Sequence, residues 1–163
     1  MNYGPMNLLH RKPTGYAASM IGFPYDHLAG WRNMYPEEVF RDQFRKLTEG
    51  WKQGLDTLTA AAPDVKQEEQ SDFREIQILA EASYCHLRST YLQICFTMAR
   101  DHGFDRQVMI RCAREEIELA EKLHAIVRRD SRIGFEASNH YYYTLNDLRE
   151  KIVSCEQILS ELD

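Results

Sequence analysis

The chain has 163 residues, of which 44% are hydrophobic and 28% charged, and its formal net charge is −5 at pH 7. This length and composition indicate one globular domain with a hydrophobic core. The acidic balance argues against nucleic-acid binding, which needs a concentrated basic surface, and no apolar run is long enough to span a bilayer. We therefore expect neither nucleic acid nor a membrane as a partner.

The first 35 residues combine helix breakers with many aromatic side chains. Their glycines and prolines leave no room for a helix of ordinary length. The segment is nevertheless too apolar for a disordered tail. We therefore predict that residues 1–35 form an extended arm that packs on the rest of the domain or on a partner. It has no basic stretch followed by an apolar one, so we expect no signal peptide.

Residues 36–163 show the three- and four-residue apolar spacing of amphipathic helices. Pro36 suits the start of the first helix, and Gly103 suits the end of the second. Thr144, with Asp147 three residues later, predicts the cap of the last helix. The predicted helices are 36–61, 65–102, 105–129 and 145–162. The expected fold is all-α, an up-down-up-down four-helix bundle with an extended aromatic N-terminal arm.

Two groups of residues have simple structural interpretations. The cysteines form no Cys-x-x-Cys pair and lie on apolar helix faces, which favours free buried thiols in a cytoplasmic protein over a disulfide or zinc framework. The charged run 114–122 is expected to be a solvated helix face with ion pairs between successive turns. The cysteines are Cys85, Cys95, Cys112 and Cys155.

The connection 130–143 is the strongest candidate for a binding site, because packed helices are usually joined by roughly 2–8 residues. The planar guanidinium of Arg132 suits a carboxylate, and the three tyrosines offer flat faces with hydroxyl tips, which suit sugars. In the structural alternative, Arg132 pairs with Asp130 or Glu136 and the tyrosines seal the loop. The predicted ligand-binding residues of this loop are Arg132, Glu136, Asn139, His140, Tyr141, Tyr142 and Tyr143.

A second candidate is the segment 22–31, which places aromatic rings beside acidic and imidazole groups. Tyr25, Asp26 and Trp31 are its predicted ligand-binding residues. The alternative is that these side chains anchor the arm. Short turns put the start of the first long helix and the loop 130–143 at opposite ends of the bundle. The arm would have to run the length of the third helix, roughly 36 Å, for both candidates to share one site.

Signatures of common catalytic centres are missing from the sequence. It has no Gly-x-Ser-x-Gly, no phosphate-binding glycine loop and no His-Glu-x-x-His. Glu121 and His124 make a single Glu-x-x-His step, whereas di-iron bundles use two. We therefore expect no metal and no cofactor, and we assign no catalytic residues.

Several segments resemble the helical C-terminal region of large bacterial glycoside-hydrolase-like proteins. They are Asp130–Tyr143, Asp147–Cys155, Gly22–Trp31 and Tyr35–Phe40. In such proteins a (β/α) barrel carries the catalytic carboxylates, so the resemblance implies an accessory domain of a carbohydrate-active protein. This chain has no barrel. Glycoside hydrolysis needs two carboxyl groups at a set separation, and nothing in the sequence brings Glu136 and Asp26 together.

Two functional hypotheses follow. In the first, the chain is a non-catalytic accessory domain whose loop 130–143 binds a sugar or an acidic sugar, or contributes to a neighbouring catalytic barrel. In the second, it is a structural module that uses the arm and the loop as an interface, for example in a homo-oligomer. The first predicts a semi-open pocket lined by Tyr141–Tyr143 with Arg132 or Glu136 facing into it. The second predicts an exposed apolar patch.

Overall fold

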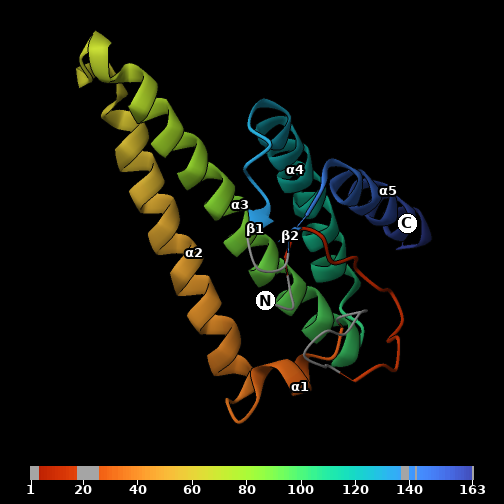
Figure 1. Ribbon diagram of the computed structural model, residues 1–163. Helices are drawn as coiled ribbons and strands as arrows, with labels where there is room; N and C mark the ends of the chain where they lie inside the picture. The colour runs from red at the N-terminus through yellow and green to blue at the C-terminus, as the bar shows by residue number, and fades with distance from the viewer. Residues whose placement is uncertain (1–3, 18–25, 137–139, 142, 163) are drawn as a thin grey trace.

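The computed structural model describes residues 4–17, 26–136, 140–141 and 143–162, with the backbone alone at 135–136 and 140–141. Four long helices dominate it (Figure 1), and the predicted all-α class is confirmed. Within the described residues, the sheet is a hairpin of two strands, each two residues long. The elements are α1 (Leu28–Arg32), α2 (Glu37–Ala60), the 3₁₀ turns η1 (Ala62–Asp64) and η2 (Gln67–Glu69), α3 (Gln70–Asp101), α4 (Arg106–Arg129), β1 (Phe135–Glu136), β2 (His140–Tyr141) and α5 (Leu145–Leu162).

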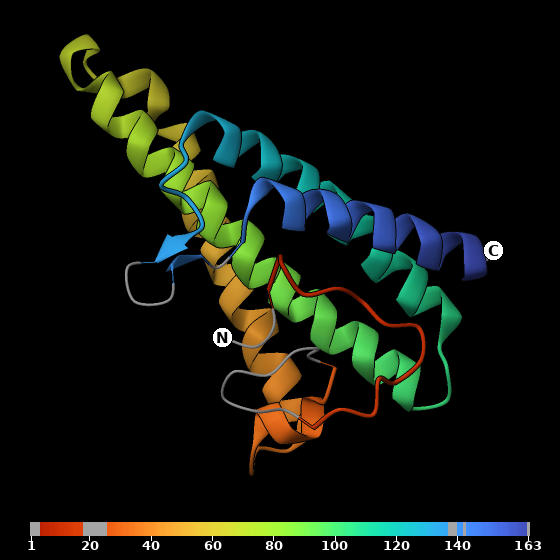
Figure 2. The same cartoon turned by 45° about the vertical axis from the view of Figure 1, so that its right-hand side comes forward.

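The long helices pack in chain order, α2 on α3, α3 on α4 and α4 on α5. In both views the far end of the α2/α3 hairpin extends beyond α4 and α5 (Figures 1 and 2). Within α2, all of which is described, Thr48 and Leu55 are the buried residues. The amphipathic spacing of this helix therefore leaves apolar side chains in contact with solvent.

Local sequence signals account for most of the helix ends. The backbone N–H of Thr144 donates to the Asp147 carboxylate at 2.5 Å, and the N–H of Asp147 donates to the Thr144 hydroxyl at 3.4 Å, so the predicted cap is confirmed. Gly103 follows α3 with a φ of +94°, a conformation that favours glycine. The helix predicted from residue 65 instead begins at Gln70, because Val65 and Lys66 are extended and interrupt it.

The main core lies among α3, α4 and α5, and it includes Leu9 from the arm and Tyr143 from the loop. A smaller cluster joins α1 to the first turns of α2 and the end of α3. It consists of Leu28, Ile94 and Met98, with Trp31, Phe40 and Phe44 packed against it.

A buried ion pair crosses the centre of the main core. Lys151 Nζ on α5 lies 3.4 Å from the Glu116 carboxylate on α4, with side-chain exposures of 0% and 1%. Ser89 on α3 donates to the same carboxylate at 2.9 Å, and Lys151 also donates to the carbonyl of Asn7 in the arm. Burial raises the pKa of Glu116, and the ion pair and the hydroxyl act in the opposite direction. The prediction of a solvated face for 114–122 is therefore wrong at Glu116.

We expect Lys151→Met to lower the free energy of unfolding by about 3–5 kcal/mol, because it leaves a buried carboxylate without its partner. Adding Glu116→Gln should recover part of the loss, since a neutral amide needs no counter-charge. Urea denaturation followed by circular dichroism measures both. As a control, Arg11→Met removes the partly exposed ion pair with Glu161 and should cost less than about 1 kcal/mol. Equal losses in Lys151→Met and Arg11→Met would contradict this assignment.

Candidate functional site

The loop after α4, the middle of α3 and one side chain of α2 surround a groove of about 440 Å³. We call it the tyrosine groove. Its walls are mainly apolar, and they include the polar side chains of one serine, one histidine and one arginine beside the amphipathic rings of Trp51 and Tyr143. The lining residues are Trp51, Leu79, Ala82, Ser83, His86, Leu87, Arg132, Ile133, Gly134 and Tyr143.

Trp51 forms one wall of this groove and is held in a fixed orientation. Its indole N–H donates to the Ala80 carbonyl on α3 at 2.9 Å, while 39% of the residue stays exposed. On its other side lies a second groove of about 470 Å³, which we call the glycine groove. That groove is lined by Lys46, Leu47, Gly50, Trp51, Gly54, Leu55, Leu58 and Ala80.

Arg132 lies at the tyrosine groove but is already paired. Its Nη2 is 2.6 Å from Asp130 and 3.7 Å from Glu75, and its Nε donates to Asp130 at 2.9 Å. The hydrogen bonds from the guanidinium lower the pKa of Asp130 to about 2. The pairing of Arg132 with Asp130 is the contact that the structural alternative for this loop predicted.

Tyr143 closes the inner end of the groove. It is 6% exposed, its ring centroid lies 6.3 Å from that of His86, and burial raises its pKa to about 12. Gly134 packs against it with a φ of +88°, and a Cβ there would lie 2.7 Å from the Tyr143 carbonyl oxygen. Only glycine fits where residue 134 approaches the backbone of Tyr143 this closely.

The remaining predicted residues of the loop are placed only in part. Glu136 pairs with His140, and Tyr141 with Phe135, in the antiparallel register of β1 and β2. Asn139 and Tyr142 lie outside the described residues, as does Tyr25 of the second candidate segment. Among the loop residues that were predicted to bind a ligand and whose side chains are described, Arg132 and Tyr143 both line the groove.

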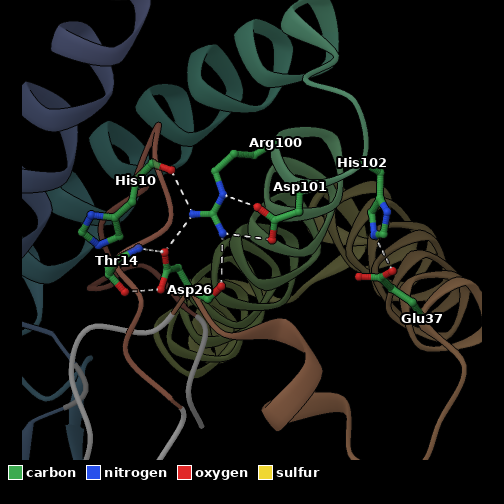
Figure 3. A network of polar contacts seen from close by, with 7 residues as sticks. All are labelled: His10, Thr14, Asp26, Glu37, Arg100, Asp101 and His102. Carbon is green, nitrogen blue, oxygen red and sulfur yellow. Dashed lines mark hydrogen bonds and ion pairs between the residues drawn. The ribbon is translucent and has the colours of Figure 1, made fainter.

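Asp26, from the second candidate segment, belongs to a buried polar network at the other end of α3 (Figure 3). It accepts hydrogen bonds from the Thr14 N–H at 2.7 Å and from Arg100 Nη1 at 2.8 Å. Arg100 also donates to the His10 carbonyl at 3.0 Å and to Asp101 at 2.7 Å. Burial by itself raises the pKa of Asp26, but the hydrogen bonds from Thr14 and Arg100 outweigh it, so the pKa is lowered.

The two candidate regions are far apart. Glu75, which contacts Arg132, and Arg100, which contacts Asp26, are separated by 25 residues of α3 (100 − 75), or roughly 38 Å at 1.5 Å per residue. Trp31 packs on Phe40 at a centroid distance of 5.0 Å, in the small cluster beside α1. Asp26 and Trp31 therefore anchor the arm, away from the tyrosine groove.

The cysteines are free thiols, and Cys85, Cys112 and Cys155 are buried. Burial raises the pKa of all four, to about 11 for Cys85 and about 12 for Cys155, so the thiolate needed for nucleophilic attack is disfavoured. No group of three or more His, Cys, Asp or Glu side chains with metal-binding geometry occurs among the residues that the structure describes.

Sequence reasoning did not place Trp51, Leu79 or His86 at a site. The apolar spacing of the first long helix predicts burial for Leu47 and Trp51, yet Leu47 is 45% and Trp51 39% exposed. A usable signal was present in Gly50 and Gly54, which interrupt an otherwise good amphipathic helix.

No family model, curated protein sequence or solved structure matches this chain. Across the described residues, the helices are too short or too polar to cross a membrane.

We expect Asp26→Asn to lower the free energy of unfolding by about 1–3 kcal/mol at neutral pH, because it weakens a buried charged hydrogen-bond network. The folded pKa of Asp26 lies below its ordinary value of 3.8. Its contribution is therefore present above pH 3.8 and is lost as the pH falls through the folded pKa. The two proteins should converge in stability in acid, as urea denaturation at several pH values would show.

The neighbouring His10 has a pKa lowered mainly by burial, whereas the charge of Asp26 acts to raise it. Both proteins are therefore compared in a His10→Gln background, in which this titration is absent. Glu161→Gln, at an exposed ion pair, is the control. A difference between wild type and Asp26→Asn that stays constant down to acid pH would refute the role given to Asp26.

Proposed function

We propose that this chain is a non-catalytic helical binding module whose site is the tyrosine groove. The observation that supports this is the convergence of Trp51, the middle of α3, residues 132–134 and Tyr143 on one cavity of about 440 Å³. Small-ligand sites commonly have volumes of roughly 300–1,000 Å³ with apolar walls and few polar groups. The groove has this size and this composition.

The lining defines the class of ligand. Trp51, Leu79 and Ile133 offer apolar surface, and Ser83 and Arg132 offer hydrogen-bond donors near it. A ring-shaped ligand with one apolar face and a hydroxyl or carboxylate edge fits this arrangement. Sugars and acidic sugars have that character, and they are the ligands that the resemblance to carbohydrate-active proteins implies. Asp130 occupies Nε and Nη2 of Arg132, so a carboxylate would have to compete with it.

A catalytic role has less support. The carboxyl groups that the sequence offered were Asp26 and Glu136. Asp26 is held by Arg100 and Thr14 at the C-terminal end of α3, whereas the groove lies at the middle of that helix. The described groups of the groove therefore act by contact and hydrogen bonding.

The test uses Trp51 as a fluorescent reporter in a Trp31→Phe background, since the chain has two tryptophans. Titration with neutral sugars and with acidic sugars should give a saturable change in emission for one class. Leu79→Arg should weaken the binding of a neutral sugar at least tenfold, because it replaces apolar lining of the groove with a charged side chain. Arg132→Ala should weaken acidic sugars more than neutral ones.

Leu47→Arg is the matched control, because Leu47 is also an exposed leucine but lines the glycine groove on the other side of Trp51. Binding should survive that change. The proposal fails if no class of probe gives a saturable response, or if the two arginine variants weaken binding equally.

A second candidate function, self-association, is favoured by the glycine groove. Glycine in a helix interior costs about 1 kcal/mol relative to alanine, yet a Cβ at Gly50 or Gly54 would meet no described atom within 4 Å. The fold of one chain therefore does not need these glycines. Leu47 and Trp51 line the same groove and are 45% and 39% exposed, so this face carries exposed apolar side chains beside a recess, a combination that can be self-complementary in a two-fold contact. The occupant we propose is a second copy of this chain.

Replacing both glycines, Gly50→Ala and Gly54→Ala, separates monomer stability from association. The free energy of unfolding of the monomer should rise by about 1–2 kcal/mol, because alanine favours the helix. The association constant from sedimentation equilibrium should fall at least tenfold, because the methyl groups fill the recess. Gln53→Ala, outside the groove on the same helix, is the control. A wild-type chain that stays monomeric at all concentrations would rule out this second function.

A further inference from the structure

Residues 4–10 of the arm lie between α3 and α5 (Figure 2). Residues Gly4–Asn7 form a turn in which the Asn7 N–H donates to the Gly4 carbonyl at 3.0 Å, with proline at the second position, where its fixed φ suits such turns. We call this four-residue segment the arm turn. Gly4, Pro5 and Asn7 are all buried.

Side chains of the helices hold the arm through its backbone. Gln93 on α3 donates to the Gly4 carbonyl at 2.6 Å and accepts from the Gly4 N–H at 3.3 Å. Lys151 on α5 donates to the Asn7 carbonyl, and Arg100 donates to the His10 carbonyl at 3.0 Å. Three carbonyl groups spaced three residues apart are therefore each recognised by a separate donor.

The donors are held in place by the buried network beneath them. Gln93 Nε2 lies 3.0 Å from the Ser89 hydroxyl, and Ser89 and Lys151 both contact the Glu116 carboxylate. These groups come from three different helices and are buried, and Gln93 and Lys151 direct hydrogen-bonding atoms at the arm. The arrangement is that of a preorganised receptor for a peptide backbone.

One position of this site favours a residue without a side chain. The ring of His86 lies over Gly4, and a Cβ there would be 3.2 Å from Cε1 of His86. A larger residue would therefore require the ring to move. Within residues 4–10, Leu9 joins the core and Met6 packs partly against it, so these two apolar side chains add to the contacts made by the backbone.

We propose that α3 and α5 form a peptide-binding site for a Gly-Pro turn, which the chain's own residues 4–10 occupy in cis and the same segment of a second copy can occupy in trans. The site is specific for this segment because its donors match the carbonyls of residues 4, 7 and 10, and because His86 selects glycine at the first of them. This inference goes beyond the groove beside Trp51 and does not rest on it.

The test is a binding titration with a fluorescent peptide of residues 1–12. The full-length Gly4→Ala chain should bind the peptide at least tenfold more tightly than the wild-type chain, because its own arm competes less well for the site. The same peptide carrying Gly4→Ala should bind at least tenfold more weakly than the unaltered peptide. Gln93→Ala in the Gly4→Ala chain should abolish binding, since it removes both contacts to Gly4.

Circular dichroism establishes that each variant is folded. A folded Gly4→Ala chain that does not bind the peptide, or that binds both peptides equally, would overturn the proposal. If the variant does not fold, the wild-type chain gives an independent readout by hydrogen exchange. An excess of unaltered peptide should then speed exchange of the chain's own Gly4 and Asn7 amides, which are hydrogen-bonded in the arm turn, at least tenfold, and unchanged exchange would also overturn the proposal.

Discussion

The buried pair of Glu116 and Lys151 is the interaction on which the arrangement of this protein depends. Two charges without solvent are tolerated only when each finds a partner and further hydrogen bonds. Here the partners come from α4 and α5, with Ser89 of α3 and the Asn7 carbonyl completing the set. The pair therefore determines how these three helices and the arm are placed relative to one another.

The arm lies between α3 and α5 (Figure 2), and α2 packs on α3. Leu9 fills the core between the helices, while Asp26 and Arg100 fasten the arm further along. Among the described long helices, α2 packs mainly on α3. Part of its apolar face is therefore left exposed. The two grooves beside Trp51 are a consequence of this open arrangement.

The loop 130–143 illustrates how far composition can identify a site. Its arginine and tyrosines drew attention to the segment that borders the tyrosine groove, because such residues are unusual in a simple turn. The contacts that each of these residues makes could not be inferred from composition. Arg132 is engaged by a neighbour two residues away, and Tyr143 is buried against His86 and Gly134. Trp51 and Leu79, which complete the groove, come from helices that the sequence treated as core.

The sequence by itself determined the all-α class and the cap made by Thr144 and Asp147, because these depend on apolar spacing and on contacts within one helical turn. Only the tertiary structure decided which charged residues are internal. Glu116 lies in a run that reads as a solvated face, and Lys151 is 35 residues away (151 − 116). The same holds for Asp26, whose partner Arg100 follows 74 residues later. Periodicity is a property of one segment, whereas burial of a charge depends on a partner that folding brings from elsewhere in the chain.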